Sequence, residues 1–185
     1  MLDYRFFSGR TKKVSARAIL RWVAILLLAC TSPVFADNAG QSGKVIAGWV
    51  ERIMLKDQPF VIKAKLDTGA KTSSFHAEDI KQFDRDGEAW VSFTLIFKDD
   101  DGELVKLPME RPRLRKVLVK EHDGNHSSRA VVGLDICFDG RIRNAEFNLI
   151  DRSEFIYPVL LGRRFLADVA IIDPAEIYLT QTTCQ

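Results

Sequence analysis

The chain of 185 residues has the length of one domain with a short appendage. Its formal charge of +2 comes from 27 basic and 25 acidic residues, but six of the basic residues and one Asp lie in the first 36 positions. The rest carries 21 basic against 24 acidic residues, a net charge of −3. This balance argues against the strongly positive surface that general nucleic-acid binding requires.

Residues 1–36 have the pattern of an export signal. A basic stretch up to Arg21 precedes an apolar run over 22–30 and a small-residue exit that ends at Ala36. The run is shorter than the ~20 apolar residues that span a bilayer. An uncleaved anchor and a lipoprotein signal with Cys30 as the lipidated residue stay open as alternatives. We therefore predict an exported, periplasmic protein, with a flexible lead-in over 37–44 and a folded domain over 45–185.

The folded domain reads as a series of short β-rich runs separated by Asp-Gly pairs. The runs pair into predicted hairpins as 45–54 with 60–66, 90–95 with 104–107, 116–120 with 129–134, and 134–138 with 141–150. Asp139-Gly140 is the strongest turn signal, because tight hairpin turns require positive φ angles. Helix is predicted only for a turn over 77–81 and a short segment over 163–168, and a closing strand over 177–179 follows Asp173-Pro174. The pattern predicts an all-β domain with one or two short helices.

Two cysteines, Cys137 and Cys184, lie in the predicted folded domain. An exported protein permits a disulfide between them. Cys137 lies within the apolar alternation of a strand, however, so a buried free thiol is the default prediction.

Asp67-Thr68-Gly69-Ala70 directly follows the alternating strand 60–66. A pair of carboxylates that shares one proton can activate water, as in the aspartic proteases. Because the domain has one Asp-Thr-Gly, the second Asp67 must come from another copy, which predicts a two-fold homodimer. Thr68 offers a hydroxyl across the dimer axis, and Gly69 lets the backbone bend close to the carboxylate. The alternative is a turn in which the Asp caps its own backbone.

A second motif, Val159-Leu160-Leu161-Gly162-Arg163, strengthens the first. Together they resemble a retropepsin-type subunit. Residues 62–77 and 151–163 are similar to the bacterial family named ATP-dependent zinc protease, which is regarded as retropepsin-like and is associated with glutamate-ligase-like ATP-grasp proteins. The similarity covers residues 45 to about 180.

The resemblance implies a closed retropepsin-like (acid protease) barrel with Asp67 as the catalytic carboxylate. Thr68 and Gly69 would be its loop partners, and Leu161 and Gly162 would form the supporting strand. Leu161 and Gly162, together with Ala70, are also expected to take part in substrate binding.

The residues do not support the zinc and ATP of the family's name. A zinc peptidase needs a ligand set such as His-Glu-x-x-His, and an ATP loop needs Gly-x-x-x-x-Gly-Lys-Ser/Thr. The sequence has neither string, and its histidines are His76, His122 and His126. We therefore predict no metal and no nucleotide cofactor.

Arg111, Arg113 and Arg115 recur at period two, hence on one side of an extended segment. They form either a solvated strand face or a docking surface for an acidic substrate, and we assign Arg113 and Arg115 to substrate binding. The hairpin over 116–131, with residues 122–125 at its tip, is the expected flap over the site, and the hairpin at Asp101-Gly102 competes with it.

The sequence thus predicts an exported aspartic endopeptidase of retropepsin type. Its expected partners are a second copy of the chain, an acidic peptide or protein substrate, and a glutamate-ligase-like protein. The alternative is a noncatalytic peptide- or ligase-binding module on the same fold.

Overall fold

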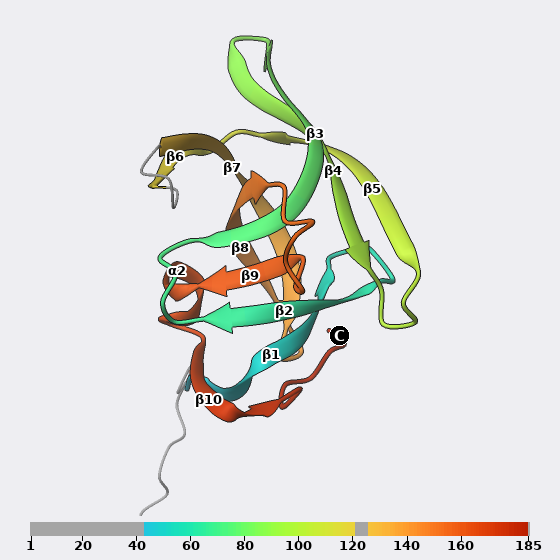
Figure 1. Cartoon of the computed structure of the whole chain (residues 1–185), viewed down its shortest axis with the longest axis vertical. Helices are drawn as coiled ribbons and strands as arrows, with labels where there is room; N and C mark the ends of the chain where they lie inside the picture. The colour runs from blue at the N-terminus through green and yellow to red at the C-terminus, as the bar shows by residue number, and fades with distance from the viewer. Residues whose placement is uncertain (1–42, 121–125, 185) are drawn as a thin grey trace, which may run out of the picture. The chain divides into compact units, whose positions relative to one another are not determined.

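A computed structural model describes residues 43–120 and 126–184 (Figure 1). Its elements are β1 (Val45–Leu55), β2 (Val61–Asp67), β3 (Ser73–Arg85), β4 (Glu88–Lys98), β5 (Leu104–Pro112), β6 (Arg115–Lys120), β7 (His126–Phe138), β8 (Arg141–Ile150), β9 (Val159–Gly162), α2 (Arg163–Leu166) and β10 (Ala170–Ile177). The predicted export signal and the predicted flap tip lie outside the described residues. Within the described ranges, no helix has the length and apolar character needed to cross a bilayer.

Six strands close into a barrel, which confirms the predicted all-β, retropepsin-like architecture. The ring runs β1, β2, β9, β3, β8 and β7, and the pairing of β7 with β1 closes it. β10 adds to β1 as a parallel edge strand, and β6 extends the sheet beyond β7. The outer half of β3 leaves the barrel and pairs with β4, which pairs with β5, so these three strands form an arm (Figure 1).

The barrel closes around apolar side chains because its strands alternate between buried and partly exposed positions. In β2, Ile62, Ala64 and Leu66 point inward and are at most 4% exposed. Phe75 and Phe147 are fully buried and stack edge to face, with ring centroids 5.6 Å apart. Each such large side chain contributes about 1.5–3 kcal/mol by leaving water.

All four predicted hairpins are confirmed by antiparallel pairing. At the β7–β8 turn, Asp139 and Gly140 have φ angles of 51° and 68°. These are the positive values that the Asp-Gly signal predicted. The short helix after Gly162 is also confirmed, as α2.

Two element predictions were wrong. Residues 77–81 belong to strand β3 and not to a helix. A bulge between Glu78 and Lys81, where Asp79 has a φ of 52°, interrupts the regular alternation of the strand. The bulge bends β3 from the barrel into the arm. The closing strand starts at Ala170 and ends at Ile177, before Tyr178 takes a positive φ of 57°. Asp173-Pro174 lies inside β10, where a register shift against β1 tolerates a proline.

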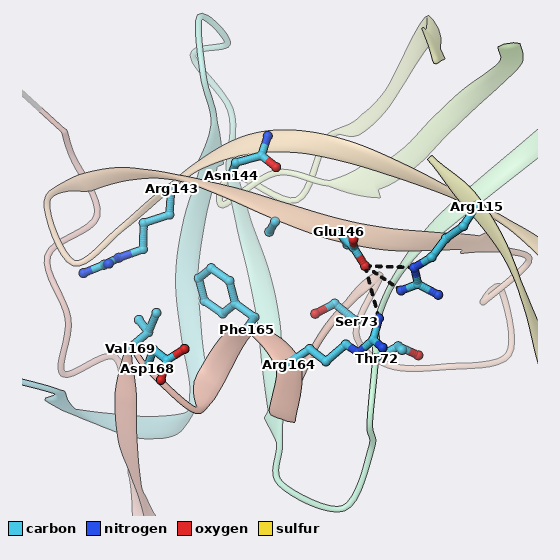
Figure 2. A pocket seen from close by; sticks show the side chains of 11 residues that line it. Thr72, Ser73, Arg115, Arg143, Asn144, Glu146, Arg164, Phe165, Asp168 and Val169 are labelled. Atoms are coloured by element: carbon cyan, nitrogen blue, oxygen red, sulfur yellow. Dashed lines mark hydrogen bonds and ion pairs between the residues drawn. The ribbon is translucent and has the colours of Figure 1, made fainter. Parts of the chain in front are cut away.

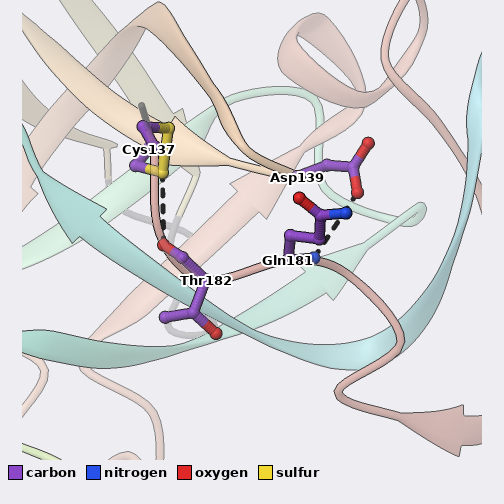
Figure 3. Close-up of a disulfide and its surroundings, with 5 residues drawn as sticks. Cys137, Asp139, Gln181 and Thr182 are labelled. Carbon is purple, nitrogen blue, oxygen red and sulfur yellow. Dashed lines mark hydrogen bonds between the residues drawn. A yellow bond between two sulfur atoms is a disulfide. The ribbon is translucent and has the colours of Figure 1, made fainter.

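The free-thiol prediction for Cys137 was also wrong, because Cys137 and Cys184 form a disulfide (Figure 3). The segment after β10 turns back over β1 and brings Cys184 to the end of β7. Glu51, fully buried on β1, accepts hydrogen bonds from Leu179 N (2.9 Å) and from the hydroxyl of Thr180 (2.9 Å). The carboxylate and the disulfide together tie the C-terminal segment to the barrel.

Candidate active site

Asp67 is the last residue of β2, and the barrel places the second motif directly beside it. β2 and β9 pair in parallel, with Leu66 opposite Leu161 and Asp67 opposite Gly162. The two motifs lie nearly a hundred residues apart in the sequence and form neighbouring strand ends in the fold (Figure 1). The loop that carries Thr68 and Gly69 begins at this point.

The carboxylate of Asp67 uses its two oxygens differently. Oδ1 accepts hydrogen bonds from the backbone N–H groups of Gly69 (2.9 Å) and Ala70 (3.1 Å). Oδ2 accepts one from Lys65 Nζ at 3.3 Å. The self-capping turn considered as an alternative is therefore present, and it fixes the carboxylate orientation that a catalytic role also needs.

The net effect of these contacts is to lower the pKa of Asp67. Partial burial is the largest influence and raises the pKa, but it is outweighed. The hydrogen bond and the charge of Lys65, with the N–H groups of Gly69 and Ala70, favour the ionised form. In the single chain Asp67 is thus an ionised carboxylate, the state that a general base requires.

The loop after Asp67 is held by the start of α2. Arg163 Nη1 donates to the carbonyl oxygens of Thr68 (2.9 Å) and Gly69 (2.8 Å), and the backbone N–H of Arg163 donates to Ala70 O (2.9 Å). A Cβ at Gly162 would lie 2.6 Å from the backbone carbon of Thr72. The glycine in the second motif is therefore required by this close approach of two backbones.

Thr68 and Gly69 are exposed at the surface of the single chain. Beside them lies a shallow, mainly apolar hollow of about 290 Å³. Its lining includes Thr68, Arg163, Leu166 and Ile171. Leu161, in contrast, is fully buried under the loop and supports it from the core side.

The three arginines at period two do not gather at Asp67. Arg111 Nη1 donates to the carbonyl of Glu110, and Arg113 Nη1 donates to Gln82 Oε1 on the arm. Arg115 binds Glu146 in a separate pocket of about 430 Å³ that Arg164 also lines (Figure 2). Arg111 lies in β5, Arg113 lies between β5 and β6, and Arg115 lies in β6, so the predicted single extended segment is divided between two strands. Each of the three arginines is engaged with a different neighbour.

The histidines do not form a ligand set in the described part of the chain. His76 is buried, and its Nδ1 accepts a hydrogen bond from Arg152 N at 2.8 Å. His126 starts β7, while His122 lies outside the described residues. No group of three or more His, Cys, Asp or Glu side chains suited to a metal ion occurs in the described ranges.

Three functional candidates were not assigned a role from the sequence: Lys65, Arg152 and Arg163. The contact of Lys65 with Asp67 could have been predicted from the sequence, because residues i and i+2 of a strand share a face. Arg163 follows the Gly of the second motif, but no local pattern shows that its side chain returns to the loop. Arg152 is brought against β3 from 78 residues away.

Comparison with known proteins agrees with this geometry. The family model described as RimB-like, retropepsin-like aspartic endopeptidase RimB, matches residues 46–183. A crystal structure of a Legionella pneumophila protein of unknown function (DUF785) is 34% identical, with a TM-score of 0.62, and the match covers 75% of this chain and 100% of that one.

Longer relatives contain a similar region. The protein named probable alpha-L-glutamate ligase from Desulfotalea psychrophila is 40% identical over 114 residues, which is 62% of this chain and 24% of that protein. Its namesake from Shewanella pealeana is 34% identical over 117 residues, 63% of this chain and 25% of that protein. The chain thus spans about a quarter of the length of these curated relatives. By its family match over most of its length, the chain belongs to the RimB-like family of retropepsin-like aspartic endopeptidases.

Proposed function

We propose that this protein is an aspartic endopeptidase that is active as a homodimer, with one Asp67 from each copy. The observation that carries the proposal is the position of the Asp67 carboxylate at the end of β2. The backbone N–H groups of its own turn orient this ionised carboxylate, and β9 lies beside it. One Asp67 would take a proton from water as it attacks the scissile carbonyl, and the protonated partner would assist the departing group.

The dimer supplies what the single chain lacks, namely a carboxylate that holds a proton. Two like charges within a few Å cannot both ionise easily, so the two Asp67 groups would titrate as a coupled pair. Lys65 lowers the pKa of Asp67 in each copy, and the approach of the second carboxylate opposes this effect.

The surface around the loop supports association of two copies. Ile46 and Ile171 are neighbours in the β1–β10 pair and are 64% and 59% exposed. β10 is the edge strand of its sheet, and no described strand pairs with its outer edge. This edge can therefore pair with a strand of another chain. This apolar edge continues into the hollow beside Thr68.

The alternative proposal is a noncatalytic binding module on the same fold. It is favoured by the occurrence of a similar region within longer proteins named probable alpha-L-glutamate ligase. Both proposals keep the expectations of export to the periplasm, an acidic peptide substrate or ligand, and a glutamate-ligase-like partner.

The substitution Asp67→Asn separates the two proposals. Cleavage of a peptide library, followed by mass spectrometry, should fall by at least about 10³-fold, because asparagine cannot act as the base. Peptide binding should persist. Asp84→Asn is the matched control, since Asp84 also caps a turn, through Gly87 N at 3.0 Å, but lies on the arm.

Full cleavage by the Asp67→Asn variant would remove the aspartic mechanism. Loss of cleavage upon chelation of metals, with Asp67 intact, would indicate a metallopeptidase. A wild-type protein that binds peptides without cleaving them would favour the binding module.

A further inference from the structure

Arg152 is a buried arginine in the segment between β8 and β9. Only 8% of its surface is exposed. Nη1 donates to Ser74 Oγ at 3.0 Å, Nε donates to the Tyr157 carbonyl at 3.2 Å, and the guanidinium lies 4.4 Å from the centroid of the Phe155 ring. These contacts fix the plane and the direction of the guanidinium.

None of the partners of Arg152 is an anion. Within the described residues, its side chain contacts a hydroxyl, a backbone carbonyl and an aromatic ring, and it forms no ion pair with a carboxylate there. Burial, followed by the charge of Arg129, lowers the pKa of Arg152, while the carboxylate of Asp67 raises it. A buried cation without a paired anion is costly, and such groups are normally paired or serve a function.

The strand register places Arg152 on the same face of the sheet as the catalytic carboxylate. Ser74, which holds Arg152, is opposite Leu160 in the β3–β9 pair. Leu160 is opposite Lys65 in the β2–β9 pair. Paired residues project to one face, and Lys65 shares its face with Asp67 two residues later. Arg152 and Asp67 therefore face the same side of these strands.

Arg152 lines a cavity of about 620 Å³. This volume is within the range of pockets that hold small ligands. Its walls include His76, Phe155, Ile156 and Lys63.

The far rim of the cavity carries three aspartates, two of which have partners. Asp100 lies 3.2 Å from Arg52 Nε and 3.9 Å from Lys63 Nζ, and Asp99 Oδ1 accepts a hydrogen bond from Glu103 N. Asp101 is exposed. The wall formed by Arg152, in contrast, offers a positive charge that is held in place by Ser74 and Tyr157 and has no carboxylate at ion-pair distance within residues 43–120 and 126–184.

We propose that Arg152 is a specificity residue that binds a carboxylate of the substrate peptide in this cavity. The carboxylate belongs either to a Glu or Asp side chain or to the C-terminus of the peptide. The planar guanidinium suits this group because it can donate two parallel hydrogen bonds. This inference rests on the proposed function and moves the acidic-substrate expectation from Arg113 and Arg115 to Arg152.

The test compares peptides that differ only in one carboxylate. Binding to full-length protein carrying Asp67→Asn is measured by calorimetry for a Glu peptide, its Gln counterpart, and both with an amidated C-terminus. We expect the loss of the recognised carboxylate to weaken binding about 10- to 100-fold, the scale of a hydrogen bond to a charged group. The pair of peptides that shows the loss identifies which carboxylate is bound.

Arg152→Gln, in the same background, should reduce this discrimination to about twofold or less, and Arg152→Lys should retain part of it. Arg85→Gln is the matched control, because Arg85 also lies over aromatic rings but on the arm. It should leave the discrimination unchanged.

Two outcomes overturn the inference: equal binding of all four peptides to the unsubstituted cavity, or full discrimination in a folded Arg152→Gln protein. The first does not depend on the stability of any Arg152 variant. If Arg152→Gln does not fold, Ser74→Ala removes one hydrogen bond to the guanidinium and should reduce discrimination by a smaller factor. Because binding is measured without cleavage, a protein that discriminates but never cleaves would refute the proposed peptidase and leave Arg152 as an anion-binding residue.

Discussion

Lys65 helps to lower the pKa of Asp67, the proposed catalytic carboxylate. Its Nζ lies 3.3 Å from Asp67 Oδ2, and both its hydrogen bond and its charge lower the pKa of Asp67. Lys65→Met removes both contributions, so the pKa of Asp67 should rise. The acid limb of the kcat/KM profile should therefore move to higher pH, as measured by peptide cleavage between pH 3 and 8. Lys81→Met, an exposed change on the arm, should leave the profile in place.

The same pair gives a stability prediction of definite sign. The folded pKa of Asp67 is lowered from 3.8, so the ionised group stabilises the fold above that pH. This contribution is lost as the pH falls through the lowered pKa. Urea unfolding at pH 7 and at acidic pH should show a smaller acid-dependent loss for Lys65→Met than for the wild type. An equal loss in both proteins would contradict the assigned role.

Single residues could be identified from the sequence where a few neighbouring positions are enough to indicate a role. Asp67 and Gly162 were recognised because a carboxylate on a glycine turn and a glycine after an apolar strand are readable in a few positions. Arg152 was not assigned, because its proposed role depends on burial against Ser74 and on the absence of a carboxylate at ion-pair distance in the described part of the chain. Both properties arise only after the chain has folded.

The β9 strand lies beside β2 and the proposed catalytic loop, and Gly162 approaches the backbone of Thr72 closely. An added Cβ would lie 2.6 Å from the Thr72 backbone carbon and 2.7 Å from its oxygen. Gly162→Ala should therefore push β9 and the start of β3 apart, cost about 1–3 kcal/mol of unfolding free energy, and lower kcat. Thermal unfolding and peptide cleavage measure the two effects.

Gly133→Ala is the control for this substitution. Its added Cβ would meet only side-chain atoms, the nearest at 3.4 Å, so the change should leave cleavage near the wild-type rate. Normal activity in a stable Gly162→Ala protein would show that the close approach is not needed for the active loop.

Hairpins were predictable from local patterns, whereas the placement of Leu161 and Gly162 beside the Asp67 loop was expected only from the family resemblance. The β7–β8 turn is signalled by two adjacent residues, Asp139 and Gly140, and its strands follow directly. The pairings of β2 with β9 and of β1 with β10 join distant segments and leave no local pattern. β3 was misread over 77–81 because a bulge disturbs the alternation by which strands are recognised.

The whole molecule is proposed to act as two copies joined along the apolar edge near Thr68. Ile171→Asp places a charge on this edge at a position 59% exposed in the single chain. Since a two-fold interface contains each residue twice, the dimer should weaken by at least about 100-fold. Cleavage should fall in parallel with the dimer fraction, as measured by analytical ultracentrifugation and peptide assays over the same concentrations. Ile142→Asp, at a 44% exposed position near the β7–β8 turn, should change neither. A monomeric Ile171→Asp protein with undiminished cleavage would show that one Asp67 suffices, and the shared-proton mechanism would then be wrong.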